Sequence, residues 1–140
     1  YYFVDEPAFK ALIANHELAE WAQVDNDKYY GVTKTELDRV KALPGKIGIW
    51  KIEYKGVATA KQMIPDILAI LIAPPDIEAL AKRSRVRGAQ TEAEIQDRLR
   101  YSQEFLEHKN LYDYVVINEE GKLEQTIDIV IEIIKKEKYI

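Results

Sequence analysis

Positively charged side chains are concentrated between residues 82 and 100 of this 140-residue sequence. The stretch carries a net charge of +3, although the whole chain has a formal charge of −4. A basic cluster on an otherwise acidic protein is typical of a site for a small anionic ligand, with a solvated helix face as the alternative. The residues concerned are Lys82, Arg83, Arg85, Arg87, Arg98 and Arg100.

The sequence gives little support for disulfides, metal sites or catalysis by histidine. The absence of cysteine excludes disulfides and thiolate metal sites, and it fits a reducing location, for which we expect the cytoplasm. His16 and His108 are the only histidines, and neither accompanies a nucleophile pattern or a metal-ligand spacing. We therefore expect both to be structural, and we expect no metal ligands in the chain.

Composition also bears on the partners. The longest purely apolar run, residues 67–73, is far shorter than the roughly 20 residues that a bilayer-spanning helix needs. The negative net charge argues against a general nucleic-acid binder, which would carry a basic surface. We expect neither a membrane nor nucleic acid as a partner, and the sequence leaves a homo-oligomer open.

The elements that position the basic cluster follow from the apolar pattern. Three short runs without polar alternation, at residues 47–50, 67–73 and 114–117, are typical of strands buried on both faces of a parallel sheet. Between and after them, helical spacing follows Asp76 and Thr91 as N-caps and begins again near Leu123. This order predicts an α/β fold with a parallel sheet flanked by helices.

The first 33 residues follow a different pattern. A strand at residues 1–4, a helix over about 6–15 and two apolar segments around a turn at 25–27 predict a small mixed β subdomain. Three buried strands alone cannot cover the helices of a parallel sheet, so the sheet looks structurally incomplete.

The order of several motifs resembles the guanylate kinases, a family of P-loop nucleoside monophosphate kinases, nearly from end to end. The resemblance implies a GMP-binding subdomain, here partial, at residues 1–33 and a core α/β domain at 34–140, with a helical lid at about 84–100. The matching segments are Tyr1-Tyr2-Phe3-Val4 with Phe9, Glu20-Trp21-Ala22, Tyr29-Tyr30-Gly31, Ile52-Glu53 with Gly56, Pro74-Pro75, Lys82-Arg83 with Arg87-Gly88, Arg98-Leu99 and the run from Tyr112 to Asn118.

The resemblance also implies a set of GMP ligands. The carboxylate of Glu20 would accept hydrogen bonds from the N1–H and N2–H₂ donors of guanine, and adenine lacks that donor pair. The phenols of Tyr1 and Tyr30 would donate to the monophosphate, and Gly31 would let the backbone approach the ligand. Thr33 and Glu53 complete the set. The alternatives are a surface position for Glu20 and aromatic packing for the tyrosines, which we expect for Tyr29.

By the same resemblance, three arginines are catalytic. Arg83, Arg87 and Arg98 would close over the transferred phosphoryl group and neutralise the charge of the transition state. We expect Arg85 and Arg100 to lie on solvated helix faces. The resemblance also implies that Asn118, at the end of a buried strand, would bind the adenine of ATP, with a turn-forming role as the alternative.

The chain departs from the family in three places. The glycine-rich loop that holds the phosphates of ATP and its Mg²⁺ is absent from the sequence. Lys51 stands where the family usually has an aspartate, and Val32 stands where it commonly has a hydroxyl residue. These departures leave a catalytically dead binding module for a phosphorylated partner as an alternative.

The activity that the resemblance implies is transfer of a phosphoryl group from ATP, with Mg²⁺, to GMP. Because the phosphate loop is absent, we expect no measurable kinase activity from the 140-residue chain alone in a coupled ADP-release assay. Turnover above a protein-free blank would contradict this expectation.

Overall fold

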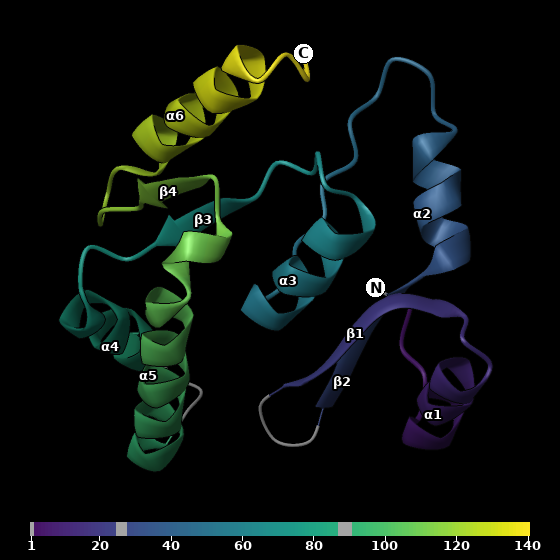
Figure 1. Ribbon diagram of the computed structural model, residues 1–140. Coiled ribbons are helices and arrows are strands. Elements are labelled where there is room, and N and C mark those ends of the chain that lie inside the picture. The colour runs from purple at the N-terminus through teal and green to yellow at the C-terminus, as the bar shows by residue number, and fades with distance from the viewer. Residues whose placement is uncertain (1, 25–27, 87–90) are drawn as a thin grey trace. The chain divides into compact units, whose positions relative to one another are not determined.

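The computed structural model describes residues 2–24, 28–86 and 91–140 (Figure 1). The chain packs as two compact units, residues 1–65 and 66–140, each with its own sheet of two strands. This division by packing is distinct from the division by ligand at residue 33, which stays a prediction.

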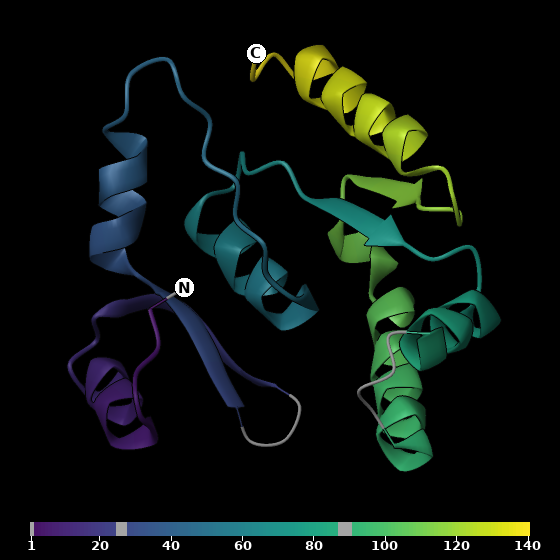
Figure 2. The ribbon, with the colours of Figure 1, turned by 180° about the vertical axis from the view of Figure 1, so that it is seen from behind.

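The first unit consists of a β-hairpin with one helix before it and two helices after it. Asp5 caps the first helix by accepting a hydrogen bond from the Ala8 amide at 2.9 Å, and Phe9 is the buried residue of that helix. Figure 2 shows the hairpin between α1 and α3. The elements are α1 (Glu6–Ala14), the antiparallel strands β1 (Leu18–Val24) and β2 (Lys28–Thr33), α2 (Lys34–Lys41) and α3 (Tyr54–Met63).

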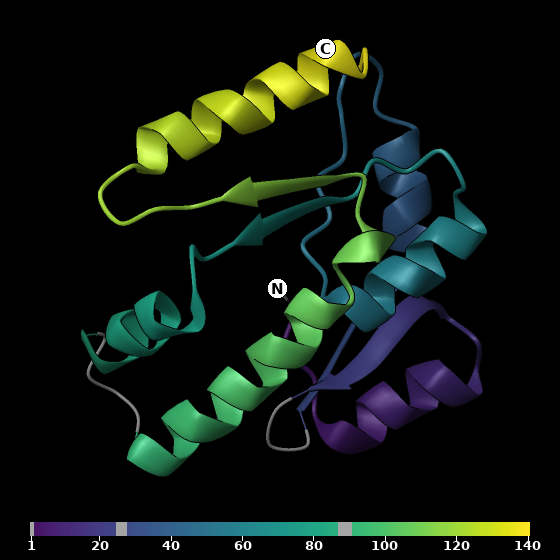
Figure 3. The same cartoon turned by 60° about the vertical axis from the view of Figure 1, so that its left-hand side comes forward.

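The second unit is built on a pair of parallel strands. The pair lies between α6 and the two helices α4 and α5, which pack against each other (Figure 3). Its elements are β3 (Ile70–Ala73), α4 (Ile77–Val86), α5 (Glu92–Glu107), a 3₁₀ turn at Lys109–Leu111, β4 (Tyr114–Ile117) and α6 (Leu123–Lys136). The parallel pairing confirms the predicted α/β class.

The predicted helix starts are also confirmed. Asp76 accepts a hydrogen bond from the Ala79 amide at 2.6 Å, and Thr91 forms a capping box with Glu94. Within the three described ranges, no helix combines the length and the apolar composition that crossing a bilayer requires.

Two predicted strands are wrong. Residues 2–5 and 46–53 have no strand structure, and Ile49 is 85% exposed. A strand persists only where a neighbour completes its hydrogen bonds, and the ladders of the described residues are β1–β2 and β3–β4 alone. The strand predicted at residues 67–73 is shorter than expected, since β3 begins at Ile70.

The strands of the second unit have apolar side chains on both faces, but the two faces are buried only in part, so the predicted burial of both faces is wrong. Leu71, Ala73 and Val116 are buried, but their neighbours Ile72 and Ile117 are 47% and 45% exposed. Two strands are too narrow for the surrounding helices to cover both faces, as the predicted sheet already suggested.

Candidate functional site

The hairpin of the first unit has two chemically different faces. In the β1–β2 register, Ala22 pairs with Tyr30 and Glu20 pairs with Val32. Directly opposed residues share a face, and successive residues alternate between faces. The structure therefore brings Glu20 and Tyr30 to one face and leaves Tyr29 on the other.

The second face of the hairpin is structural. The rings of Phe9 and Trp21 lie 5.5 and 6.2 Å from that of Tyr29, which confirms the expected packing role of Tyr29. Gly31 belongs to this cluster, because a Cβ atom there would stand 2.7 Å from the backbone oxygen of Glu20 and 3.2 Å from the Phe9 ring. The glycine thus serves the packing of the hairpin and α1, and its predicted role in the approach of a ligand stays a prediction.

Glu20 lies on the first face and is only 4% exposed. The register shifts between Leu18 and Glu20, where β1 advances two residues and β2 one. Such a bulge changes the direction of the side chains beside it. The surface position that was the alternative for Glu20 is therefore wrong.

A second carboxylate lies close to Glu20. Burial, and then repulsion from Glu53, raise the pKa of Glu20 to about 7. Burial also raises the pKa of Glu53, against a smaller lowering by the nearby ammonium of Lys55. Both carboxylate oxygens of Glu53 are buried without a hydrogen-bond partner in the part of the chain that the structure describes. Buried polar atoms are normally paired, so this carboxylate pair suits a ligand that offers several N–H donors.

Two other predicted GMP ligands lie on the same hairpin. Tyr30 is 48% exposed, so its phenol is accessible to a ligand. The Thr33 hydroxyl caps α2 by accepting a hydrogen bond from the Glu36 amide at 3.2 Å, which leaves its proton available for donation. Their contacts with GMP stay predictions.

In the second unit, Arg83 and Asn118 come together although 35 residues separate them. The Arg83 guanidinium donates to the backbone oxygen of Asn118 at 2.6 Å. The backbone N–H of Asn118 donates to the backbone oxygen of Ala73, at the end of β3, at 2.8 Å. The buried hydroxyl of Thr126 donates to the side-chain oxygen of Asn118 at 3.3 Å. Because the guanidinium of Arg83 bonds a neutral carbonyl, the positive charge of Arg83 stays available for an anion.

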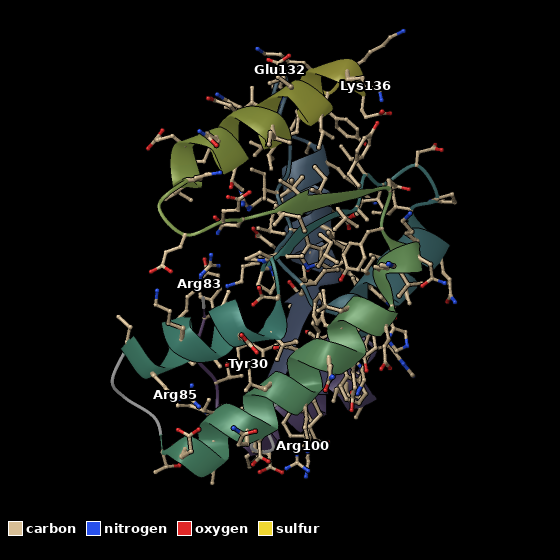
Figure 4. All side chains as sticks on the ribbon, turned by 90° about the vertical axis from the view of Figure 1, so that its left-hand side faces the viewer. Tyr30, Arg83, Arg85, Arg100, Glu132 and Lys136 are labelled. Atoms are coloured by element: carbon tan, nitrogen blue, oxygen red, sulfur yellow. The ribbon has the colours of Figure 1, made fainter. Side chains whose placement is uncertain are left out.

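The neighbouring basic residues differ from Arg83. Arg85 pairs with Glu92 at 2.5 Å, and Arg100 pairs with Asp97 on its own helix. Both arginines are exposed, as expected for solvated helix faces, and Figure 4 shows them apart from Arg83. Arg83 is thus the described basic residue that best fits the predicted anion chemistry.

Three predicted site residues lie outside this description. Tyr1 and Arg87 are not among the described residues, and the side chain of Arg98, at a position within α5, is not described either. Their roles stay predictions from the resemblance. Of the histidines, His108 bonds the Glu104 carbonyl through Nδ1 at 2.7 Å, which agrees with a structural role.

Sequence reasoning assigned no role to two residues that contact the site. Thr126 supports Asn118, and Gly56 in the first turn of α3 leaves room for the Glu20 carboxylate. A glycine inside a helix is unfavourable, and Gly56 also belongs to the family resemblance together with Ile52-Glu53, but neither signal pointed to a role for it. No pattern along the chain pointed to Thr126, because its partner Asn118 precedes the helix.

Comparison with known proteins gives a consistent result. The family model described as "Guanylate kinase" matches residues 1–137. A guanylate kinase of Rickettsia prowazekii is 36% identical over 138 residues, which cover 99% of this chain and 68% of the relative. One from Synechococcus sp. is 38% identical over 127 residues, which cover 91% of this chain and 57% of the relative.

A solved structure shares the fold. The crystal structure of guanylate kinase from Anaplasma phagocytophilum matches 99% of this chain and 65% of its own chain, with a TM-score of 0.75 and 31% identity. The chain therefore spans about two thirds or less of the length of these relatives.

Proposed function

Since the chain belongs to the guanylate kinase family, we propose that it carries the GMP-binding and core parts of an enzyme that transfers a phosphoryl group from ATP to GMP. The observation that carries the proposal is the buried pair of carboxylates, Glu20 and Glu53, on the first unit. Guanine supplies adjacent N1–H and N2–H₂ donors for such a pair, whereas adenine has a single amino group beside an acceptor nitrogen.

The remaining roles are assigned by chemistry. The phenol hydroxyl of Tyr30 donates a hydrogen bond to the monophosphate of GMP, as that of Tyr1 would. Thr33 and Glu53 complete the contacts with the nucleotide. Arg83, with Arg87 and Arg98, neutralises charge on the transferred group, because the planar guanidinium fork matches phosphate oxygens. Asn118 contacts the adenine of ATP. The contact between Arg83 and Asn118 supports this assignment, because it joins the residue for the phosphoryl group to the residue for the base.

The chemistry itself requires positioning and charge neutralisation. The GMP phosphate attacks the terminal phosphorus of ATP in line, so that a P–O bond to GMP forms as the bond to ADP breaks. Mg²⁺ would accompany ATP in this reaction and neutralise charge on its phosphates. No three His, Asp or Glu side chains of the described residues come together as a metal site, so these residues do not form a Mg²⁺ site by themselves.

One observation favours a second candidate. Lys51 is exposed and stands two residues before Glu53, where the family usually has an aspartate. A cation there would suit a binding module for a phosphorylated partner better than an enzyme. A phosphoserine peptide that competes with GMP would support this candidate.

The proposal is tested by the choice of nucleotide. We expect the 140-residue chain to bind GMP more tightly than AMP or dTMP, by about tenfold or more, because charge-assisted hydrogen bonds contribute about 1.5–3 kcal/mol each. Isothermal titration calorimetry of the three nucleotides measures this preference, and their shared monophosphate makes AMP and dTMP matched controls. Equal affinities for GMP and AMP would remove Glu20 and Glu53 from their assigned roles.

A further inference from the structure

We propose that Gly56 is a positioning residue that sets the place of the Glu20 carboxylate and thereby the preference of the site for guanine. The proposal rests on the function proposed above. Gly56 is buried in the first turn of α3, the helix that packs against β1. A Cβ atom on Gly56 would stand 2.6 Å from Oε1 of Glu20 and 2.8 Å from its Cδ.

These distances are too short for any side chain at position 56 without a displacement. The third neighbour of the added atom, the Cβ of Ile52, lies 3.3 Å away and needs to yield only a few tenths of an ångström. The atoms of Glu20 that collide are the far end of a side chain that can rotate, whereas β1 and α3 are held by their backbone hydrogen bonds. An alanine at position 56 therefore moves the carboxylate and leaves the fold in place.

The displacement matters because guanine recognition is geometric. The N1–H and N2–H₂ donors of guanine lie side by side on one edge, and a carboxylate receives both only when its two oxygens face that edge. The carboxylate of Glu53 lies close enough to repel that of Glu20, but it has no hydrogen-bond partner among the described residues, so it does not hold Glu20 in place by a hydrogen bond. The vacant side-chain position at Gly56 is the space that the Glu20 carboxylate fills.

The helix itself gains nothing from this glycine. Glycine is a poor helix former because its backbone loses the most conformational freedom on folding, and alanine is the best. A glycine that served the helix alone would be improved by alanine. Positioning of Glu20 thus predicts that Gly56→Ala raises the melting temperature of the chain and weakens its binding of GMP.

The experiment compares five forms of the 140-residue chain by calorimetric titration with GMP and IMP and by thermal unfolding: the wild type, three single variants and one double variant. IMP presents the N1–H donor without the 2-amino group, so the ratio of the two affinities reports the fit of the carboxylate. We expect Gly56→Ala to weaken GMP binding by about tenfold or more, to reduce the preference for GMP over IMP, and to raise the melting temperature.

Two further variants separate positioning from a structural role. Thr59→Ala, on the same helix, improves helix propensity and removes only a hydrogen bond to Lys55 in that helix, so we expect GMP binding to stay as in the wild type. Glu20→Asp shortens the side chain, so we expect it to weaken GMP binding alone but to restore part of the affinity in the Gly56→Ala background.

The outcomes have distinct meanings. A wild-type chain that prefers GMP together with a Gly56→Ala variant of equal affinity would overturn the proposal and leave the proposed function intact. Loss of GMP and IMP binding together with a lower melting temperature would show a structural role and would also overturn it. A wild-type chain that binds no GMP would overturn both the function and the inference.

Discussion

Glu20→Gln should weaken GMP binding by roughly 10- to 100-fold, which corresponds to about 1.5–3 kcal/mol for hydrogen bonds to a charged group. The glutamine keeps the shape of the side chain but offers one acceptor oxygen in place of two, and its NH₂ group opposes the donors of guanine. Because the substitution also removes a buried charge beside Glu53, the free energy of unfolding at pH 8 should not fall. Calorimetric titration and urea unfolding measure the two quantities.

The matched control is Glu17→Gln, which removes the same charge from an exposed residue just before β1. Its affinity for GMP should equal that of the wild type. The assignment of Glu20 fails if both substitutions weaken GMP binding equally, or if Glu20→Gln weakens AMP binding as much as GMP binding.

Glu20 should contribute a pH dependence to the stability of the ligand-free chain, and Glu20→Gln should remove that contribution. The pKa of Glu20 is about 7 in the folded chain, above its ordinary value of 4.5, so the folded state holds this proton more tightly than the unfolded state. The contribution of Glu20 to the free energy of unfolding is therefore greatest below pH 4.5 and decreases as the pH rises towards 7, by at most about 1.4 kcal/mol per pH unit. Above pH 7 this contribution changes no further.

Other carboxyl groups contribute as well. The raised pKa of Glu53 acts in the same direction as that of Glu20, whereas lowered pKa values act in the opposite direction and at lower pH. Pairing with Arg39 lowers the pKa of Glu36, and pairing with Arg85 lowers that of Glu92. The difference between the wild type and Glu20→Gln isolates the group of interest. Parallel stability profiles from pH 5 to 8 would contradict the assigned protonation of Glu20.

Ligand binding should show the reverse trend. Guanine donors bind the ionised carboxylate, so lowering the pH below about 7 should weaken binding by up to tenfold per pH unit. Guanosine is the informative ligand, because the phosphate of GMP titrates near pH 6 and would add its own effect. Affinity for guanosine that stays constant between pH 5.5 and 7.5 would show that the ionised form of Glu20 is not required.

Local signals predicted the helices of the second unit well. Asp76 and Thr91 cap their helices through their own side chains, and the apolar spacing after Leu123 matches α6. Such features depend on residues within one or two turns, so they are legible along the chain. The same reasoning missed α2 and α3: α2 is short and mostly polar, and Glu53 at the N-cap of α3 forms no side-chain capping hydrogen bond.

Strands were harder to predict because pairing is not a local property. The apolar run at 47–50 has the composition of a buried strand, yet it has no ladder in the structure, whereas the equally short run at 114–117 pairs with β3. Composition was the same in kind, and the neighbour made the difference.

The candidate site likewise has features that the sequence predicted and features that depend on the tertiary structure. Residue types and their order were enough to identify the family and to single out Glu20 as a candidate guanine ligand. They also distinguished Arg83, as a candidate for the anion site, from Arg85 and Arg100. The tertiary structure alone decided that Glu20 is buried beside Glu53, that Arg83 bonds the carbonyl of Asn118, and that Gly56 makes room for a carboxylate. Motifs are short-range and survive in a linear reading, whereas burial, carboxylate repulsion and steric room depend on distances between residues that meet only when the chain folds.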